Sequence, residues 1–128
     1  MTWLYEQVSG RLLDPNGDIA ATGYAGGNAG KNMDDRNNPD MQDRPNIGPL
    51  PVGKYTLGKP VLQSHLGQFA IPLIPSPENE MFGRSAFYIH GDSIRNPGKA
   101  SEGCIIVSRS VRERMWASDD HDLTVVRG

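Results

Sequence analysis

The sequence predicts a small, mostly β fold with one short helix and one long loop, and three observations support this prediction. Short apolar runs typical of strands alternate with clusters of turn residues along most of the chain. Glycine and proline account for 15 and 10 of the 128 residues, which is typical of a turn-rich protein that still folds. One segment near the C-terminus has helical periodicity. The length suits one domain, so we expect a single domain over residues 1–128.

The N-terminal part of the chain is expected to form a β-meander. Residues 3–8 alternate between two faces, as strand residues do, and a two-residue turn follows them. Arg11–Leu13 begins the return strand, and Pro15-Asn16-Gly17 forms a second turn. Ile19–Tyr24 is expected to be a third short strand, which Gly23 weakens.

Residues 25–51 are expected to form a long loop, because they are rich in Gly, Asn, Asp and Pro and have almost no apolar periodicity. A loop of this length in a compact domain is usually either functional or disordered, so it either covers the site or is dispensable. Its acidic residues lack the spacing of an EF-hand calcium loop, and we interpret them as a solvated face. These residues are Asp34, Asp35, Asp40 and Asp43.

The remainder of the chain contains further short strands and the single helix. The expected strands are Gly53–Leu57, Phe69–Ile74, Phe87–His90, Cys104–Val107 and Leu123–Val126. The helix is expected over Val111–Ala117, capped by Ser108 or Ser110, with Val111, Met115 and Trp116 on its buried face.

Composition excludes several classes of function. The net charge is −2 and no stretch concentrates Lys or Arg, so we expect no nucleic-acid binding. The apolar runs are far too short to span a bilayer, so we expect no membrane insertion. The N-terminal residues MTWLYEQ lack the regions of a secretory signal, which predicts synthesis in the cytoplasm without a signal peptide. A single cysteine excludes an intrachain disulfide and a multi-cysteine zinc site, and we expect no cofactor.

The most informative stretch places a histidine and the single cysteine at the ends of two strands. His90 ends one expected strand, and Cys104 opens another after Gly103. If the two strands pair side by side, the imidazole and the thiol come together. An unassisted thiol is mostly protonated at neutral pH, and a neighbouring imidazole can accept its proton. This pair therefore suits acyl transfer, with Cys104 as the nucleophile and His90 as the general base.

Other residues near this pair are candidates for supporting roles. Backbone N–H groups around Gly103 and Cys104 would form an oxyanion hole. Arg84 is a candidate for a bidentate contact with a substrate carboxylate, or else forms a surface ion pair. Tyr88 either lines the substrate groove or packs as an ordinary aromatic residue. The group that orients His90 is drawn from several candidates: Asp92, Ser93, Ser101 or a backbone carbonyl.

Two alternatives belong to different classes of protein. A zinc-dependent hydrolase would use His90, Asp92 and Cys104 as ligands, because imidazole, carboxylate and thiolate all bind zinc. A non-catalytic binding module of a secretion or phage particle would bury Cys104 as an inert core residue, which is the usual environment of a lone cysteine.

The motif around the pair resembles that of a known family. The order His90-Gly91, then a loop, then Ser101-Glu102-Gly103-Cys104 is similar to that of the L,D-transpeptidases, in which His-Gly is followed by a loop and by Ser or Thr before His-Gly-Cys. The wider pattern NNPDMQ, GPLPVGKY, FGRSAFYIHGDS and ASEGCIIV resembles the L,D-transpeptidase-like effectors of bacterial type VI secretion systems over nearly the whole chain. Glu102 stands where the general family has a second His, and Ile105-Ile106-Val107 stands where an Arg is usual.

This resemblance implies a small β-sandwich of mixed sheets and a cell-wall chemistry. Cys104 would attack the carbonyl of the third residue of a peptidoglycan tetrapeptide stem and release the terminal D-alanine. Water would then give L,D-carboxypeptidase activity, a D-amino acid would give exchange, and the amine of another stem would give a cross-link. As an antibacterial effector the protein would act in the target-cell periplasm. Its expected partners are stem peptides, a cognate immunity protein and a secretion apparatus component.

Overall fold

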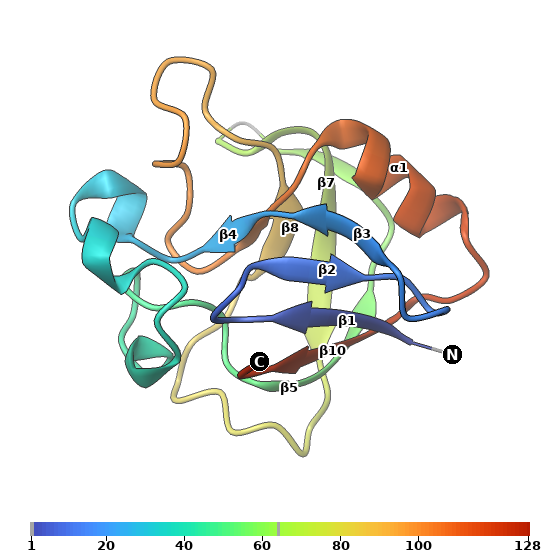
Figure 1. Ribbon diagram of the computed structural model, residues 1–128, viewed down its shortest axis with the longest axis horizontal. Helices are drawn as coiled ribbons and strands as arrows, with labels where there is room; N and C mark the ends of the chain where they lie inside the picture. The colour runs from blue at the N-terminus through green and yellow to red at the C-terminus, as the bar shows by residue number, and fades with distance from the viewer. Residues whose placement is uncertain (1, 64) are drawn as a thin grey trace.

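The computed structural model describes residues 2–63 and 65–128, and Figure 1 shows their arrangement. The elements are β1 (Trp3–Glu6), β2 (Arg11–Leu13), β3 (Ile19–Thr22), β4 (Tyr24–Ala25), the 3₁₀ helices η1 (Asn28–Gly30), η2 (Met33–Asp35) and η3 (Pro39–Met41), β5 (Gly53–Leu57), β6 (Val61–Gln63), β7 (Gly67–Pro75), β8 (Tyr88–His90), β9 (Ile105–Ile106), α1 (Arg109–Ala117) and β10 (Asp122–Val126). The predicted mostly β fold with one short helix is confirmed.

The strands form one continuous mixed sheet. Their order is β3-β2-β1-β10-β5-β7-β8-β9-β4, and β6 pairs with β7 as a side branch. The pairs β1/β10 and β8/β9 are parallel, and the other pairs are antiparallel. The parallel β8/β9 pair is the part of the sheet that carries the expected His and Cys.

Gly23 makes the sheet curl back on itself. The single strand expected over residues 19–24 is divided at this glycine into β3 and β4, which lie at opposite ends of the strand order. A Cβ atom on Gly23 would lie 1.9 Å from the carbonyl oxygen of Ile106, so only glycine fits this close approach. Because one residue joins the two ends of the sheet, the sheet must bend around the core. In Figure 1 β1, β2 and β3 run across the front while β7 and β8 cross behind them.

The core lies inside this bend and is built by the strand register. Trp3 and Tyr5 of β1 pair with Leu123 and Val125 of β10, and Leu123 pairs in turn with Tyr55 of β5. All five side chains are almost fully buried. Alternation in each strand sends these residues to the same face, so the central strands present one continuous apolar surface.

The helix α1 closes one side of the core against β7 and β8. It starts at Arg109, two residues before the expected start, and Ser108 is its N-cap residue, although the Ser108 side chain makes no capping hydrogen bond. Met115 is fully buried, while Val111 and Trp116 are half-buried against the core, as the helical periodicity predicts.

The segment 25–51 is an ordered cover over the cysteine segment. It is less irregular than expected, because it contains the three short 3₁₀ helices, which gather at the left of Figure 1. The backbone N–H of Gly26 donates to the Ser101 hydroxyl, and the N–H of Leu50 donates to the carbonyl of Gly103. The sequence left two roles for this loop, a cover over the site or a dispensable segment, and these contacts support the cover.

Candidate active site

The strands β8 and β9 bring His90 and Cys104 to one face of the sheet. The expected side-by-side pairing of the two segments is confirmed, and it is parallel, with Ile89 opposite Ile105 and His90 opposite Ile106. Residues opposite each other in parallel strands point to the same side, and side chains alternate along a strand. Cys104, two residues before Ile106, therefore shares the face of His90.

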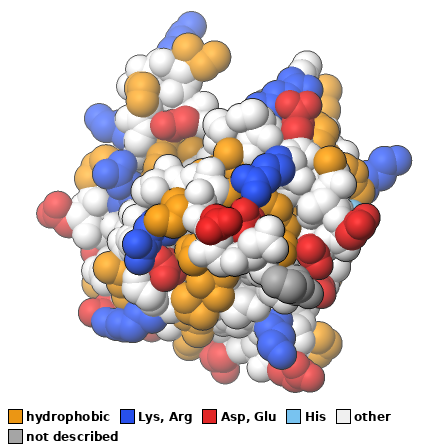
Figure 2. Space-filling view, turned by 45° about the vertical axis from the view of Figure 1, so that its right-hand side comes forward, with side chains coloured by type: hydrophobic (Ala, Val, Ile, Leu, Met, Phe, Trp, Pro, Cys, Tyr) orange, Lys and Arg blue, Asp and Glu red, His pale blue; other side chains and the backbone are white. Residues whose placement is uncertain are grey.

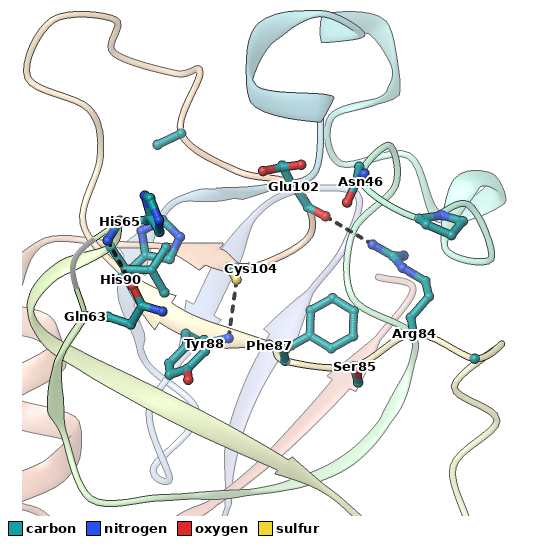
Figure 3. Close-up of a pocket in the computed structure, with 15 residues that line it drawn as sticks. Asn46, Gln63, His65, Arg84, Ser85, Phe87, Tyr88, His90, Glu102 and Cys104 are labelled. Atoms are coloured by element: carbon teal, nitrogen blue, oxygen red, sulfur yellow. Dashed lines mark hydrogen bonds between the residues drawn. The ribbon is translucent and has the colours of Figure 1, made fainter.

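Both side chains open into a cavity of about 480 Å³, which is within the size range of small-ligand sites. Three other parts of the chain form its walls: Pro45 and Asn46 from the covering loop, His65 and Leu66 after β6, and residues 83–87 before β8. Figure 3 shows Cys104 in the middle, with His90 and His65 on one side and Asn46 and Arg84 on the other.

His90 is held as a neutral base. Its Nδ1 lies 2.9 Å from the carbonyl oxygen of Gly91. A carbonyl only accepts hydrogen bonds, so Nδ1 carries the ring proton and Nε2 is left with its lone pair. Burial lowers the pKa of His90, and the positive charge of Arg112 lowers it further. The orienting group is thus the backbone carbonyl, one of the four candidates from the sequence.

Cys104 is held as a neutral thiol. Burial raises its pKa to about 11, and the negative charge of Glu102 acts in the same direction. The backbone N–H of Tyr88 donates to Sγ at 3.3 Å and partly opposes this increase. Within the described residues, no hydrogen bond joins Sγ to the imidazole of His90. The resting pair is therefore a neutral thiol and a neutral imidazole, so the proton must move during the attack.

Ser101 fixes the backbone that carries Cys104. Its hydroxyl is fully buried, donates to the carbonyl of Cys104 at 2.6 Å, and accepts from the N–H groups of Gly26 and Gly103. Because the Gly103 N–H is already bonded, it is not free to stabilise an oxyanion, in contrast to the expectation. The backbone N–H groups of Tyr88 and of Cys104 itself interact with the thiol.

Arg84 holds the covering loop against the cysteine segment. Nη1 donates to the carbonyls of Gln42 and Pro49, and Nη2 donates to those of Gly48 and Glu102. Four of the five guanidinium N–H donors are engaged in this way. The expected bidentate contact with a substrate carboxylate is therefore not available in this arrangement, and neither is a surface ion pair, because Arg84 is buried.

Asp92 and Ser93 organise the loop after β8 and do not orient His90. The Asp92 carboxylate accepts from the Tyr24 hydroxyl at 2.5 Å and from the N–H groups of Ser93 and Gly98. The Ser93 hydroxyl accepts from the N–H of Asn96. Within the described part of the chain, no group of three His, Cys, Asp or Glu side chains is placed to hold a metal ion, so the ligand set of the zinc alternative is not assembled.

Tyr88 contributes its backbone N–H to the thiol and its half-buried side chain to the cavity wall. Sequence reasoning missed two features of the site. Arg112 of α1 is buried and close enough to His90 to lower its pKa, and its Nη1 donates to the carbonyls of Gln68 and Phe69. His65 reaches the cavity from an exposed turn. A buried charge on an amphipathic helix gives no local signal, and neither does a turn histidine.

Comparison with known proteins decides the family. Residues 21–127 match the family model of the Tlde1 domain. The chain belongs to the Tlde1 domain family. The match makes it a type VI secretion effector domain, in the context of antibacterial toxins, for which an immunity protein and a secretion apparatus are fitting partners. Searches of curated proteins and of solved structures each returned no significant match.

The face of the Tlde1 domain that Figure 2 shows has no continuous stripe of basic side chains. In Figure 2 basic and acidic side chains are interspersed over the visible face. Among the described residues, no helix is both long and apolar enough to cross a membrane.

Proposed function

We propose that this Tlde1 domain is a cysteine acyltransferase that acts on tetrapeptide stems of peptidoglycan. One observation carries the proposal: the thiol of Cys104 and a base-competent His90 lie on the same face of a parallel strand pair and open into a cavity of peptide size. The sequence motif around both residues resembles that of the L,D-transpeptidases, and this resemblance suggests the substrate class. The effector family adds the biological setting, in which damage to a competitor's wall is useful.

The proposed first step is acylation. Nε2 of His90 accepts the thiol proton as Sγ of Cys104 forms a bond to the carbonyl carbon of the third stem residue. The carbonyl electron pair moves to oxygen, where the N–H groups of Tyr88 and Cys104, which both interact with the thiol, are the proposed donors. The pair then returns, the C–N bond breaks, and the imidazolium gives its proton to the departing amine of D-alanine. A thioester on Cys104 remains.

The second step returns the enzyme to its resting state. Nε2 of His90 takes a proton from water or from an incoming amine, which attacks the thioester carbonyl, and the thiolate leaves and is reprotonated. Water gives a shortened stem, a free D-amino acid gives exchange, and the amine of a second stem gives a cross-link. Hydrolysis and exchange both remove the normal donor stem and so deprive the wall of cross-links.

The test is mass spectrometry of purified tetrapeptide muropeptides after incubation with the wild type and with Cys104→Ala, with and without an added D-amino acid. We expect the wild type alone to remove or exchange the terminal alanine. Thermal melting of both proteins is the control, because an inactive variant is informative only if it is folded. Turnover by a folded Cys104→Ala variant would refute Cys104 as the nucleophile. Absence of turnover in both proteins would refute the acyl-thioester proposal and favour a non-catalytic module.

A further inference from the structure

A second cavity continues the first one past the imidazole of His90. It also measures about 480 Å³ and shares His65, Leu66, His90 and Ala100 with the first cavity. Its other wall is the loop 91–99. The hollow surface therefore has two arms that meet at His90: the thiol arm, which holds Cys104 and Glu102, and the loop arm, which holds Arg95 and Lys99.

The chemistry of the proposed reaction assigns each arm to one part of the substrate. Cys104 lines the thiol arm and not the loop arm, so the acyl residue attached to Sγ occupies the thiol arm. His90 lines both arms and gives its proton to the departing amine. The leaving residue, and the acceptor that replaces it, therefore lie beyond His90 in the loop arm.

The exposed charged side chain of the thiol arm is acidic. Glu102 is exposed, and Figure 3 shows its side chain above Cys104. The positive charge of Arg84 in the same arm is buried and is directed at four backbone carbonyls. A ligand in this arm therefore meets the carboxylate of Glu102 rather than the guanidinium of Arg84.

The loop arm offers charges of the opposite sign. Arg95 and Lys99 are both exposed, and neither forms an ion pair within residues 2–63 and 65–128. The stem of Lys99 rests on Gly30 of the covering loop, where an added Cβ would lie 2.8 Å from Cδ. The acidic residue of this arm, Asp92, is already engaged by the Tyr24 hydroxyl and by two backbone N–H groups. The arm therefore presents net positive charge to a ligand.

We infer that the groove is polarised to bind a zwitterionic peptide: Glu102 pairs with an ammonium group on the side chain of the acyl residue, and Arg95 and Lys99 pair with the free carboxylate of the leaving residue. This inference rests on the proposed function and specifies its substrate. The groove then favours a diamino acid with a free side-chain amine at the third position of the stem. It also favours a leaving residue at the C-terminus over one internal to a longer peptide.

The test uses four synthetic tetrapeptides, with the side-chain amine of the third residue either free or acetylated and the C-terminus either a carboxylate or a carboxamide. The kcat/KM of each is measured for the wild type, Glu102→Gln and the double variant Arg95→Gln/Lys99→Gln. Glu113→Gln and Lys59→Gln are matched controls, because these charges line neither arm. Each result is read as a ratio of two substrates on one enzyme, so that a change in thiol pKa caused by losing the Glu102 charge cancels.

We expect the wild type to prefer the free amine and the free carboxylate, each by about two- to fivefold, as partly exposed ion pairs do. Glu102→Gln should abolish only the amine preference, and the double variant should abolish only the carboxylate preference. High salt should reduce both preferences, because exposed charges are screened. Wild-type turnover with either preference absent, or unchanged by its variant, would overturn the inference alone. No Cys104-dependent turnover of any of the four peptides would overturn the proposed function with it.

Discussion

Replacing Arg84 tests whether this buried cation is part of the framework of the site. The guanidinium donates to the carbonyls of Pro49 and Gly48 at 2.8 and 3.1 Å, and both of these residues are buried. It also donates to the carbonyls of Gln42 and Glu102 at 2.6 and 3.2 Å, where water can reach after a substitution. Arg84→Met keeps much of the side-chain volume but removes every donor.

The expected loss of folding stability in Arg84→Met follows from the two buried carbonyls. Each buried acceptor left without a donor costs about 1–3 kcal/mol, so Arg84→Met should destabilise the fold by about 2–6 kcal/mol. The whole free energy of unfolding of a domain is about 5–15 kcal/mol, so the variant should be marginally stable. Arg84→Lys retains a cation with three donors and should lose about half as much.

Urea denaturation measures the effect. With a slope of about 2 kcal/mol per molar urea, Arg84→Met should lower the midpoint by about 1–3 M. Arg44→Met is the matched control, because Arg44 is exposed and makes only a 3.9 Å contact with Asp43, so its change should stay within about 0.5 kcal/mol. An Arg84→Met midpoint equal to that of the control would refute the assignment of Arg84 as a framework residue.

Three further predictions concern the reactive centre and its loops. The pKa of Cys104 is raised to about 11, so its rate of alkylation by iodoacetamide should increase about tenfold per pH unit from pH 7 to 10, without the plateau that a cysteine of ordinary pKa shows near pH 9. The pKa of His90 is lowered from 6.5, so kcat/KM should decline only below pH 6.5, where the imidazole becomes protonated and ceases to be a base. Tyr24→Phe removes the hydroxyl that bonds Asp92 and Ala100, so amide hydrogen exchange at Ala100 should accelerate while the melting temperature decreases slightly.

Each of these measurements has an outcome that contradicts its reasoning. A plateau in the alkylation rate at or below pH 9 would mean that the thiol is not stabilised in its neutral form. An acid limb of kcat/KM above pH 6.5 would mean that His90 is not held neutral by burial and by Arg112. Unchanged exchange at Ala100 in Tyr24→Phe would mean that the loop is held by contacts other than the Tyr24 hydroxyl.

Local patterns were sufficient for much of the fold. The strand Gly53–Leu57 matches its expected bounds, because alternation is clear and turn residues flank it on both sides. β6 was missed, because Val61–Gln63 is short and largely exposed and exists through its pairing with β7. The division at Gly23 was also missed as a structural break, since its cause is the carbonyl of Ile106, far away in the sequence.

The candidate site was predictable only where its geometry is local. A strand end and a strand start separated by one loop are sequence features, so the proximity of His90 and Cys104 could be predicted from them. The roles of Arg84 and Arg112 depend on carbonyls from distant segments that only the folded chain brings together. The role of a charged side chain is therefore difficult to predict from the sequence, because burial decides whether its donors face the protein or a ligand.

Burial separates the charged groups of this site into two kinds. Arg84 and Arg112 are buried, and their donors are directed at backbone carbonyls, so they hold the cysteine and histidine segments in place. Glu102, Arg95 and Lys99 are exposed and line the groove. Substitution of a buried group leaves carbonyls unsatisfied and should lower stability and activity together, whereas substitution of an exposed group should change selectivity with little change in stability. Comparing the urea midpoint with the substrate ratios for the same variants therefore distinguishes framework from recognition.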